Sequence, residues 1–238
     1  EETVGGTLNS NATVCSGSNS GTLELTGQTG DIVRWEKTTN NWGDVINVSN
    51  TTISEGYADL TTTTKYRAII QSGVCSETTS SEVTITIDSA STGGVLSKDT
   101  AVCEGANSGT LFLSDYTGDV LRWEFSTDHF MSSTTLTNTS RTVSFSDLTE
   151  DTRYRAVVQS GVCSSDFSNA VQITVNTLPD IDLGEDRLIC HQTPFVLDAG
   201  SNGIEYLWND ERSSKTLTVF SKGTYSVIVK DQNNCFGY

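Results

Sequence analysis

A long internal repeat limits the fold of this chain more than any other sequence feature. Cys15 and Cys103 are 88 residues apart, and so are Trp35 and Trp123, so one offset aligns the two copies without a gap. A period of this length is too long for a solenoid unit and suits an independently folded β-sandwich. The matched stretches are Asn-Ser-Gly-Thr-Leu at 19–23 and 107–111, Thr-Gly-Asp at 29–31 and 117–119, Arg-Trp-Glu at 34–36 and 122–124, Tyr-Arg-Ala at 66–68 and 154–156, and Gln-Ser-Gly-Val-Cys-Ser at 71–76 and 159–164.

Each copy has the residue pattern of short β-strands. Apolar residues alternate with polar ones, as at Leu23 and Leu25 and again at Val83, Ile85 and Ile87. Turn sequences separate these runs every ~8–12 residues, the spacing of a sandwich with about seven strands. We therefore expect an all-β protein of tandem Ig-like β-sandwich domains, arranged as beads on a string. The expected strands of the first copy are 22–27, 31–37, 44–48, 52–58, 65–71 and 82–88, with an edge strand near 5–14.

The last quarter of the chain does not follow the offset but repeats the order of its landmark residues at a smaller scale. Cys190, Trp208, Tyr225 and Cys235 occur in the same order as Cys, Trp, Tyr and Cys in each copy. The sequence then ends before the closing strand expected from the two full copies, which predicts a fragment of a longer protein. The predicted domains are 1–88, 89–176 and a shorter Ig- or PKD-like module at 177–238, truncated before its last strand.

Bulky aromatic residues in the middle of the strand patterns are the predicted core. A large ring there fills the space between two sheets and contributes a few kcal/mol through burial, at ~25 cal/mol per Å². The predicted core aromatics are Trp35, Trp123, Trp208, Tyr66, Tyr154 and Tyr225.

The charge of the chain argues against two classes of partner. It carries 14 Lys and Arg against 30 Asp and Glu, a formal net charge of −16. A chain this acidic repels nucleic acid and anionic membranes, so neither is an expected partner. No apolar run approaches the ~20 residues of a membrane span, so we expect no membrane insertion by this segment.

Six cysteines without a C-x-x-C pair indicate disulfides, and therefore an oxidising compartment outside the cytoplasm. Six cysteines allow 15 connectivities. Because a modular array folds domain by domain, we expect each pair to form within one domain, where each bridge contributes roughly 2–4 kcal/mol. The predicted pairs are Cys15–Cys75, Cys103–Cys163 and Cys190–Cys235.

The sequence offers little for catalysis. Its two histidines, His129 and His191, lie in different domains, and neither has a counterpart in the matching copy. No nucleophile elbow, zinc-binding helix or phosphate-binding glycine loop is present. We predict that the protein is not an enzyme and carries no cofactor.

The densest acidic stretch is a candidate calcium site. Hard oxygen ligands beside an interdomain linker could hold calcium and stiffen the joint, although no known calcium-loop signature is present. A solvated acidic loop is the preferred interpretation, and calcium binding is the alternative. The four acidic residues are Asp180, Asp182, Glu185 and Asp186.

Two aromatic residues at equivalent positions are candidate ligand contacts. Trp42 and Phe130 lie in the segment where the copies differ most, 38–49 against 126–137. An exposed ring there could stack on a sugar, but a ring folded over its own hairpin turn is the preferred interpretation.

The repeat motifs resemble a known family. The stretches at 5–76 and 93–164 are similar to the Ig-like repeats of very large surface proteins of gliding Bacteroidota, the SprB-type gliding motility adhesins. The final segment, with Pro179–Asp186, Tyr206-Leu-Trp208 and Gly223-Thr-Tyr225, is similar to the short PKD-like or gliding-associated modules of such proteins. The resemblance implies type IX secretion, display on the cell surface, and a role in gliding motility.

These observations give a leading hypothesis and two alternatives. The leading hypothesis is a non-catalytic piece of a large cell-surface adhesin, in which disulfide-stapled repeats act as filament, spacer and adhesive surface. Its expected partners are other domains of the same long chain and an external surface or polysaccharide. The first alternative is an accessory stalk or carbohydrate-binding arm of a secreted polysaccharide-degrading enzyme. In the second, the domains bind nothing and only position a distant tip.

Overall fold

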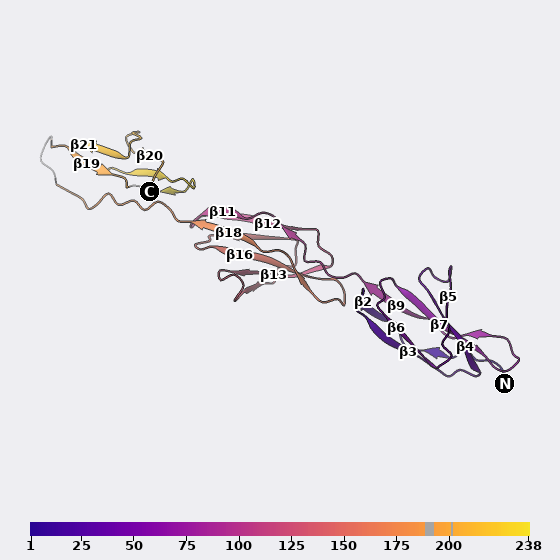
Figure 1. The fold of residues 1–238 in the computed structure, drawn as a ribbon. Coiled ribbons are helices and arrows are strands. Elements are labelled where there is room, and N and C mark those ends of the chain that lie inside the picture. Colours follow the sequence, from indigo (N-terminus) through magenta and orange to yellow (C-terminus); the bar gives the residue numbers. More distant parts are fainter. Residues whose placement is uncertain (189–192, 201) are drawn as a thin grey trace.

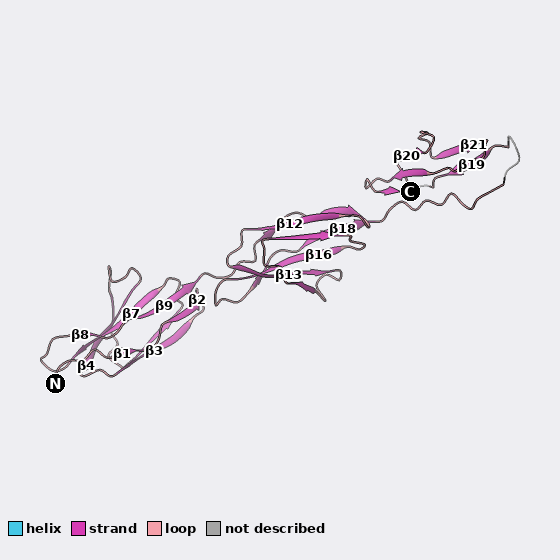
Figure 2. Cartoon of the chain, turned by 180° about the vertical axis from the view of Figure 1, so that it is seen from behind, coloured by secondary structure: helices cyan, strands magenta, loops and turns pink. Residues whose placement is uncertain are grey.

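The protein is an all-β chain of three domains that follow one another in a row (Figure 1). The computed structural model describes residues 1–188, 193–200 and 202–238. Every regular element in these ranges is a strand (Figure 2), and none of them contains a helix long and apolar enough to cross a membrane. The tandem arrangement of sandwich domains predicted from the sequence is confirmed.

The first repeat packs a three-stranded sheet, in the order β1-β3-β6, against a larger sheet in the order β2-β9-β7-β4-β5. A short strand, β8, also pairs with β7 in the larger sheet. The strands of this repeat are β1 (Thr7–Leu8), β2 (Ala12–Cys15), β3 (Ser20–Thr26), β4 (Asp31–Thr38), β5 (Ile46–Val48), β6 (Ser54–Ala58), β7 (Thr64–Gln71), β8 (Thr78–Thr79) and β9 (Val83–Asp88).

The edge strand expected near 5–14 is divided between the two sheets. β1 pairs antiparallel with β3, whereas β2 pairs parallel with β9. Between them, the Asn11 side chain accepts a hydrogen bond from the backbone N–H of Thr84 at 2.8 Å. This side chain accepts the hydrogen bond that a backbone carbonyl would otherwise accept, at the point where the chain crosses from one sheet to the other. The alternation of apolar and polar residues in the sequence does not reveal this crossing.

The second repeat has the same topology. Its smaller sheet has the order β10-β12-β15 and its larger sheet the order β11-β18-β16-β13-β14, with β17 paired to β16. Its strands are β10 (Val95–Leu96), β11 (Thr100–Cys103), β12 (Ser108–Ser114), β13 (Asp119–Ser126), β14 (Thr134–Leu136), β15 (Thr142–Ser146), β16 (Thr152–Gln159), β17 (Asp166–Phe167) and β18 (Val171–Asn176).

A fully buried tryptophan stands at the centre of each repeat's core. Trp35 on β4 and Trp123 on β13 are both 0% exposed. Each indole N–H donates to a backbone carbonyl, Trp35 to Thr52 at 3.0 Å and Trp123 to Ser140 at 2.9 Å. The ring therefore buries its apolar area without leaving its polar atom unpaired, and it ties the larger sheet to the segment before the outer strand of the smaller sheet.

The tyrosines predicted for the core of the repeats are also buried. Tyr66 and Tyr154 lie at the same register on β7 and β16, beside the tryptophan clusters. Burial, with the Glu55 carboxylate and Tyr57 as smaller causes, raises the pKa of Tyr66 to about 12. Burial also raises the pKa of Tyr154.

The third domain builds a smaller core from two sheets, β19-β21 and β20-β22-β23. Trp208 is 1% exposed and donates its indole N–H to the Ser214 carbonyl at 2.8 Å, while Tyr225 is only partly buried against the same cluster. The small domain thus repeats the tryptophan arrangement of the larger ones. Its strands are β19 (Phe195–Asp198), β20 (Glu205–Trp208), β21 (Thr216–Val219), β22 (Val227–Lys230) and β23 (Phe236–Gly237).

The glycine of the repeated Thr-Gly-Asp motif is required by the fold. Gly30 and Gly118 both have a φ of 114°, a conformation that L side chains rarely adopt. A Cβ on Gly118 would also lie 2.4 Å from the backbone carbonyl of Gln159 on the neighbouring strand. The motif therefore marks the point where the chain passes close to that strand on entering β13.

We predict that Gly118→Ala destabilises the second repeat by clearly more than about 1 kcal/mol, because the left-handed strain is joined by a backbone clash. Gly105→Ala is the matched control, since Gly105 has a φ of 86° but no atom lies within 4 Å of the place that an added Cβ would take. Calorimetric unfolding of both variants measures the difference. Equal losses would show that the close approach to Gln159 carries no energy.

Candidate functional site: the disulfide-linked joints

The two disulfides between described residues connect neighbouring domains. Cys15 of the first repeat bonds Cys163 of the second, with a Cα–Cα distance of 4.9 Å. Cys103 of the second repeat bonds Cys235 of the third domain, with a Cα–Cα distance of 5.5 Å. The predicted pairings within single domains are therefore wrong for these four cysteines.

The reason is that the two cysteines of a repeat lie at opposite ends of it. Cys15 ends β2, where parallel pairing sets it in register with Asp88 at the exit of the repeat. Cys75 follows β7 at the entrance, where its thiol lies 3.5 Å from the carbonyl of Glu1. Cys75 is consequently unbonded, and Cys190 lies outside the described residues.

The first joint is reinforced by hydrogen bonds around its disulfide. The Asp88 carboxylate accepts the backbone N–H of Val162 at 2.9 Å, and it occupies the space where a Cβ on Gly161 would lie. The backbone N–H of Ser160 donates to the Ser91 hydroxyl, also at 2.9 Å. The Gln-Ser-Gly-Val-Cys-Ser motif is thus a docking turn that receives the end of the preceding domain.

The second joint uses the same end of the repeat but a different receiving turn. Cys103 is in register with Asn176 at the end of β18, as Cys15 is with Asp88. Cys235 lies in the tight turn between β22 and β23, where its backbone N–H donates to the Asp231 carboxylate at 2.8 Å. Here the linker also packs on the third domain, because Gly237 lies against the carbonyl of Pro179.

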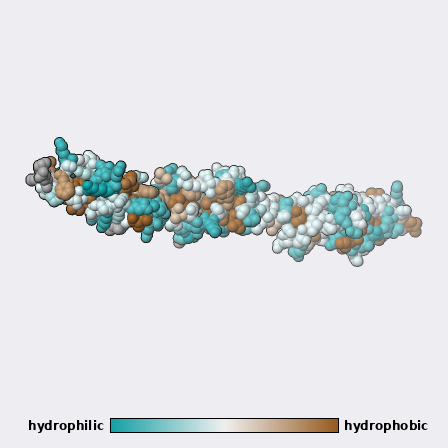
Figure 3. All heavy atoms as spheres, turned by 90° about the horizontal axis from the view of Figure 1, so that it is seen from above, coloured by the Kyte–Doolittle hydropathy of each residue, from teal (hydrophilic) through white to brown (hydrophobic). Residues whose placement is uncertain are grey.

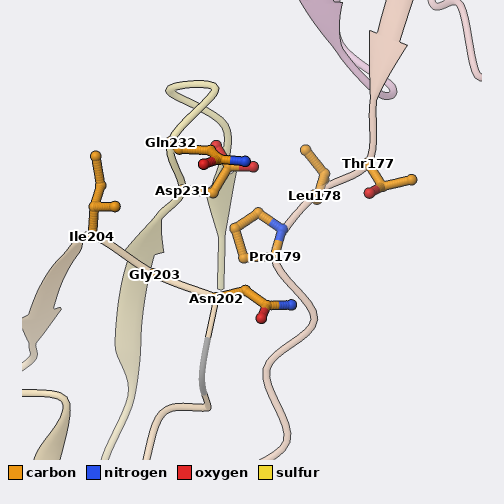
Figure 4. Close-up of a pocket in the computed structure, with 8 residues that line it drawn as sticks. All are labelled: Thr177, Leu178, Pro179, Asn202, Gly203, Ile204, Asp231 and Gln232. Atoms are coloured by element: carbon orange, nitrogen blue, oxygen red, sulfur yellow. The ribbon is translucent and has the colours of Figure 1, made fainter.

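A cleft of about 410 Å³ opens beside this second joint (Figure 4). Its one carboxylate, Asp231, already accepts backbone N–H groups of its own turn. Nothing in the lining converges on a ligand, so we assign no binding role to the cleft. Its lining residues are Thr177, Leu178, Pro179, Asn202, Gly203, Ile204, Asp231 and Gln232.

The predicted ligand-contact aromatics stack on arginines. The guanidinium of Arg67 lies 3.9 Å from the centroid of the Trp42 ring, and that of Arg155 lies 4.1 Å from the centroid of Phe130. The Trp42 indole also donates to Glu82 at 2.7 Å. One face of each ring is therefore covered by a cation of its own domain, an arrangement that stabilises both partners.

Local loop geometry sets these rings in place. Trp42 and Phe130 have φ values of 69° and 64°, which is uncommon for aromatic residues. In the second repeat the Ser126 hydroxyl accepts the backbone N–H of Phe130 at 2.9 Å. Hydrogen bonds from Ser132 and Ser126 lower the pKa of the neighbouring Asp128 to about 2. The loops differ in sequence, yet they hold the ring in the same way.

Each repeat also buries a carboxylate between two arginines. Glu36 pairs with Arg34 and Arg67, and Glu124 pairs with Arg122 and Arg155, at distances of 2.7–2.9 Å. Burial opposes ionisation of Glu124, but hydrogen bonds from Arg155 and Arg122 outweigh it and lower the pKa of this carboxyl. These glutamates, which the sequence did not single out, anchor the same arginines that cover the rings.

The acidic stretch after the second repeat is not assembled into a metal cluster. Within the described ranges, no three His, Cys, Asp or Glu side chains converge where they could hold a metal ion. The Asp182 carboxylate instead accepts the backbone N–H of Gly184 at 2.7 Å. Calcium binding by Asp180, Asp182, Glu185 and Asp186 stays the alternative to a solvated acidic loop. Of the histidines, His129 is exposed, and His191 lies outside the described residues.

Comparison with known proteins identifies the repeat. A family sequence profile described as "Domain of unknown function (DUF8696)" matches residues 4–89 and again residues 92–177. The chain belongs to this family. Each match spans one of the two long repeats, so the DUF8696 domain is the two-sheet sandwich described above. No curated protein matches the chain.

Solved structures with similar folds are tandem Ig and fibronectin-type domains. The match to the N-terminal four Ig domains of Dscam1 covers 73% of this chain and 47% of the Dscam1 chain, at 11% identity and a TM-score of 0.35. Chicken CNTN1 FN1–FN3 domains match 100% of this chain and 95% of theirs, at 13% identity and a TM-score of 0.33. Drosophila OTK extracellular domains 3–5 match 97% of this chain and 92% of theirs, at 10% identity and a TM-score of 0.33.

We predict that proteolysis without reductant releases peptides that join Cys15 to Cys163 and Cys103 to Cys235, identifiable by mass spectrometry. The Cys163→Ser variant should keep both repeat cores, because neither contains this disulfide, but it should bend more freely at the first joint. Small-angle X-ray scattering measures this as a broader distance distribution, and Cys75→Ser is the control that should leave it unchanged. A Cys15–Cys75 peptide would contradict the interdomain pairing.

Proposed function

We propose that this chain is a non-catalytic segment of a large cell-surface adhesin, serving as an extended spacer and adhesive surface in gliding motility. The observation that carries this proposal is the covalent connection of each domain to the next by a disulfide. A disulfide inside a domain stabilises that domain, whereas one between domains fixes how they follow one another. An interdomain disulfide is therefore most useful in a protein whose domains must keep a fixed arrangement along an extended chain.

The two disulfides form overlapping loops, which suits a chain under tension. Cys103 lies within the stretch that the Cys15–Cys163 bond closes, and Cys235 lies beyond it. A pulling force that reaches Cys15 passes through the bond to Cys163. The shortest covalent path then returns along the backbone to Cys103 and crosses the second bond to Cys235, so the segments 16–102 and 164–234 are relieved of load. Unfolding of a core then cannot release the full length of the chain.

Charge and surface character support an exposed, extended role. The net charge of −16 disfavours collapse and self-association of neighbouring segments. Polar and apolar residues are interspersed along the elongated face in Figure 3. Disulfides persist in oxidising compartments, which supports a location outside the cell. Secretion by the type IX route and membership of the Bacteroidota gliding machinery rest on sequence resemblance.

The carbohydrate-binding arm is the second candidate, and the aromatic rings give it less support. Trp42 is engaged by Arg67 on one face and by Glu82 at its indole N–H. A platform that stacks on sugars needs aromatic rings with open faces. Each repeat has only one candidate ring, Trp42 or Phe130, and an arginine covers one face of it. The structure offers no further feature in the described ranges that favours this alternative.

We expect antibodies raised against this chain to label intact cells that produce the protein, with the label travelling along the cell as it glides. Live-cell immunofluorescence is the measurement, and preimmune antibody is its control. A label that stays fixed on the surface would support a static stalk. Recovery of the protein mainly from the medium would favour the secreted-enzyme arm.

We predict that the disulfides shorten the chain under load. Together the two bonds bypass the 88 residues from Cys15 to Cys103 and the 72 residues from Cys163 to Cys235. At ~3.4 Å per residue, full unfolding between the termini should therefore yield about 540 Å less extension when oxidised than when reduced. In Cys163→Ser the remaining bond spans 132 residues and should withhold about 450 Å. Single-molecule force extension measures both. Equal extensions in the oxidised and reduced states would refute the tension-bearing role.

A further inference from the structure

The entrance surface of the first repeat matches the surface with which the second repeat receives its neighbour. Both consist of the same Gln-Ser-Gly-Val-Cys-Ser turn, at 71–76 and at 159–164. In the second repeat this turn carries Cys163, which is bonded to the exit cysteine of the preceding domain. In the first repeat the same position is Cys75, which is unbonded.

Two local contacts of the turn recur at equivalent positions in both repeats. Ser72 donates its backbone N–H to the Thr3 hydroxyl at 3.1 Å, as Ser160 donates to the Ser91 hydroxyl at 2.9 Å. The sulfur of Cys75 lies 3.5 Å from the Glu1 carbonyl, and that of Cys163 lies 3.2 Å from the Ser89 carbonyl. The entrance of the first repeat is therefore already arranged for docking.

Exposure shows what docking covers. Val74 is 103% exposed, whereas its counterpart Val162 is 56% exposed beside the preceding domain. Cys163 is 2% exposed in its bonded state, while Cys75 is partly exposed. Val162 and Cys163 are less exposed than Val74 and Cys75 because the exit end of the first repeat covers them.

We infer that Cys75 is an interdomain disulfide site, and that its partner is another DUF8696 repeat docked by its exit end. That end would present a cysteine equivalent to Cys15 to the sulfur of Cys75. It would also present a carboxylate equivalent to Asp88 to the backbone N–H of Val74, as the first joint does at Val162. This inference goes beyond the proposed function and does not depend on a role in gliding motility.

Formation of the bond is an ordinary thiol–disulfide exchange. A small-molecule disulfide, such as oxidised glutathione, supplies the oxidising equivalents. One thiolate attacks it to give a mixed disulfide and one thiol, and the second cysteine then displaces the remaining small thiol. In the net reaction, two cysteine thiols and one disulfide become one interdomain disulfide and two small-molecule thiols, so atoms and electrons balance.

The test extends the full chain by one repeat. A second copy of residues 1–88 is fused directly ahead of Glu1, so that the copied Asp88 precedes Glu1 as Asp88 precedes Ser89 in the natural joint. After folding in a glutathione redox buffer, we expect a peptide that joins Cys75 to the cysteine of the added copy that corresponds to Cys15. Alkylation of Cys75 by iodoacetamide under native conditions should fall at least tenfold relative to the unextended chain.

The matched control replaces that one cysteine of the added copy by serine. It keeps the same domains and linker, so Cys75 should stay reactive to iodoacetamide, while slowed hydrogen exchange at Val74 should still report docking. Full alkylation of Cys75 in the extended chain would overturn the inference. So would a bond from Cys75 to any other cysteine, including one in a second molecule.

Discussion

The parallel pairing of β2 with β9 is the constraint on which the rest of the array depends. It sets Cys15 beside Asp88, at the point where the chain leaves the first repeat, and the equivalent pairing of β11 with β18 sets Cys103 beside Asn176. An antiparallel partner for the same strand would reverse its direction and carry the cysteine to the other end of the sheet. The strand direction thus decides that the disulfides join domains.

The cores and the joints are energetically distinct. Each core is organised around a buried tryptophan whose indole N–H is bonded to a backbone carbonyl, and none of the three depends on a disulfide inside its own domain. Closing a loop of 148 residues reduces the entropy of the unfolded chain, a contribution of about 5 kcal/mol in the chain-entropy account. Because that loop includes residues of both repeats, this stabilisation is shared by two domains and couples their unfolding.

The arginine stacks illustrate how a loop can vary in sequence while keeping its geometry. Trp42 in one repeat and Phe130 in the other each cover an arginine that is fixed from below by a buried glutamate. The aromatic position is therefore better explained by packing within the domain than by a ligand. Only the three-dimensional arrangement brings Arg67 and Arg155 under these rings, since each lies more than twenty positions along the chain from its aromatic partner.

The sequence by itself determined the strands and the tandem sandwiches, because these follow from local alternation and an ungapped repeat. Tertiary structure decided which cysteines pair, since Cys15 and Cys75 belong to one repeat but lie at its opposite ends, and proximity along the chain says nothing about that. It also decided that the strand expected at 5–14 divides between two sheets. Periodicity reports which face of a strand is buried, whereas pairing partners and strand direction are settled only when distant segments meet.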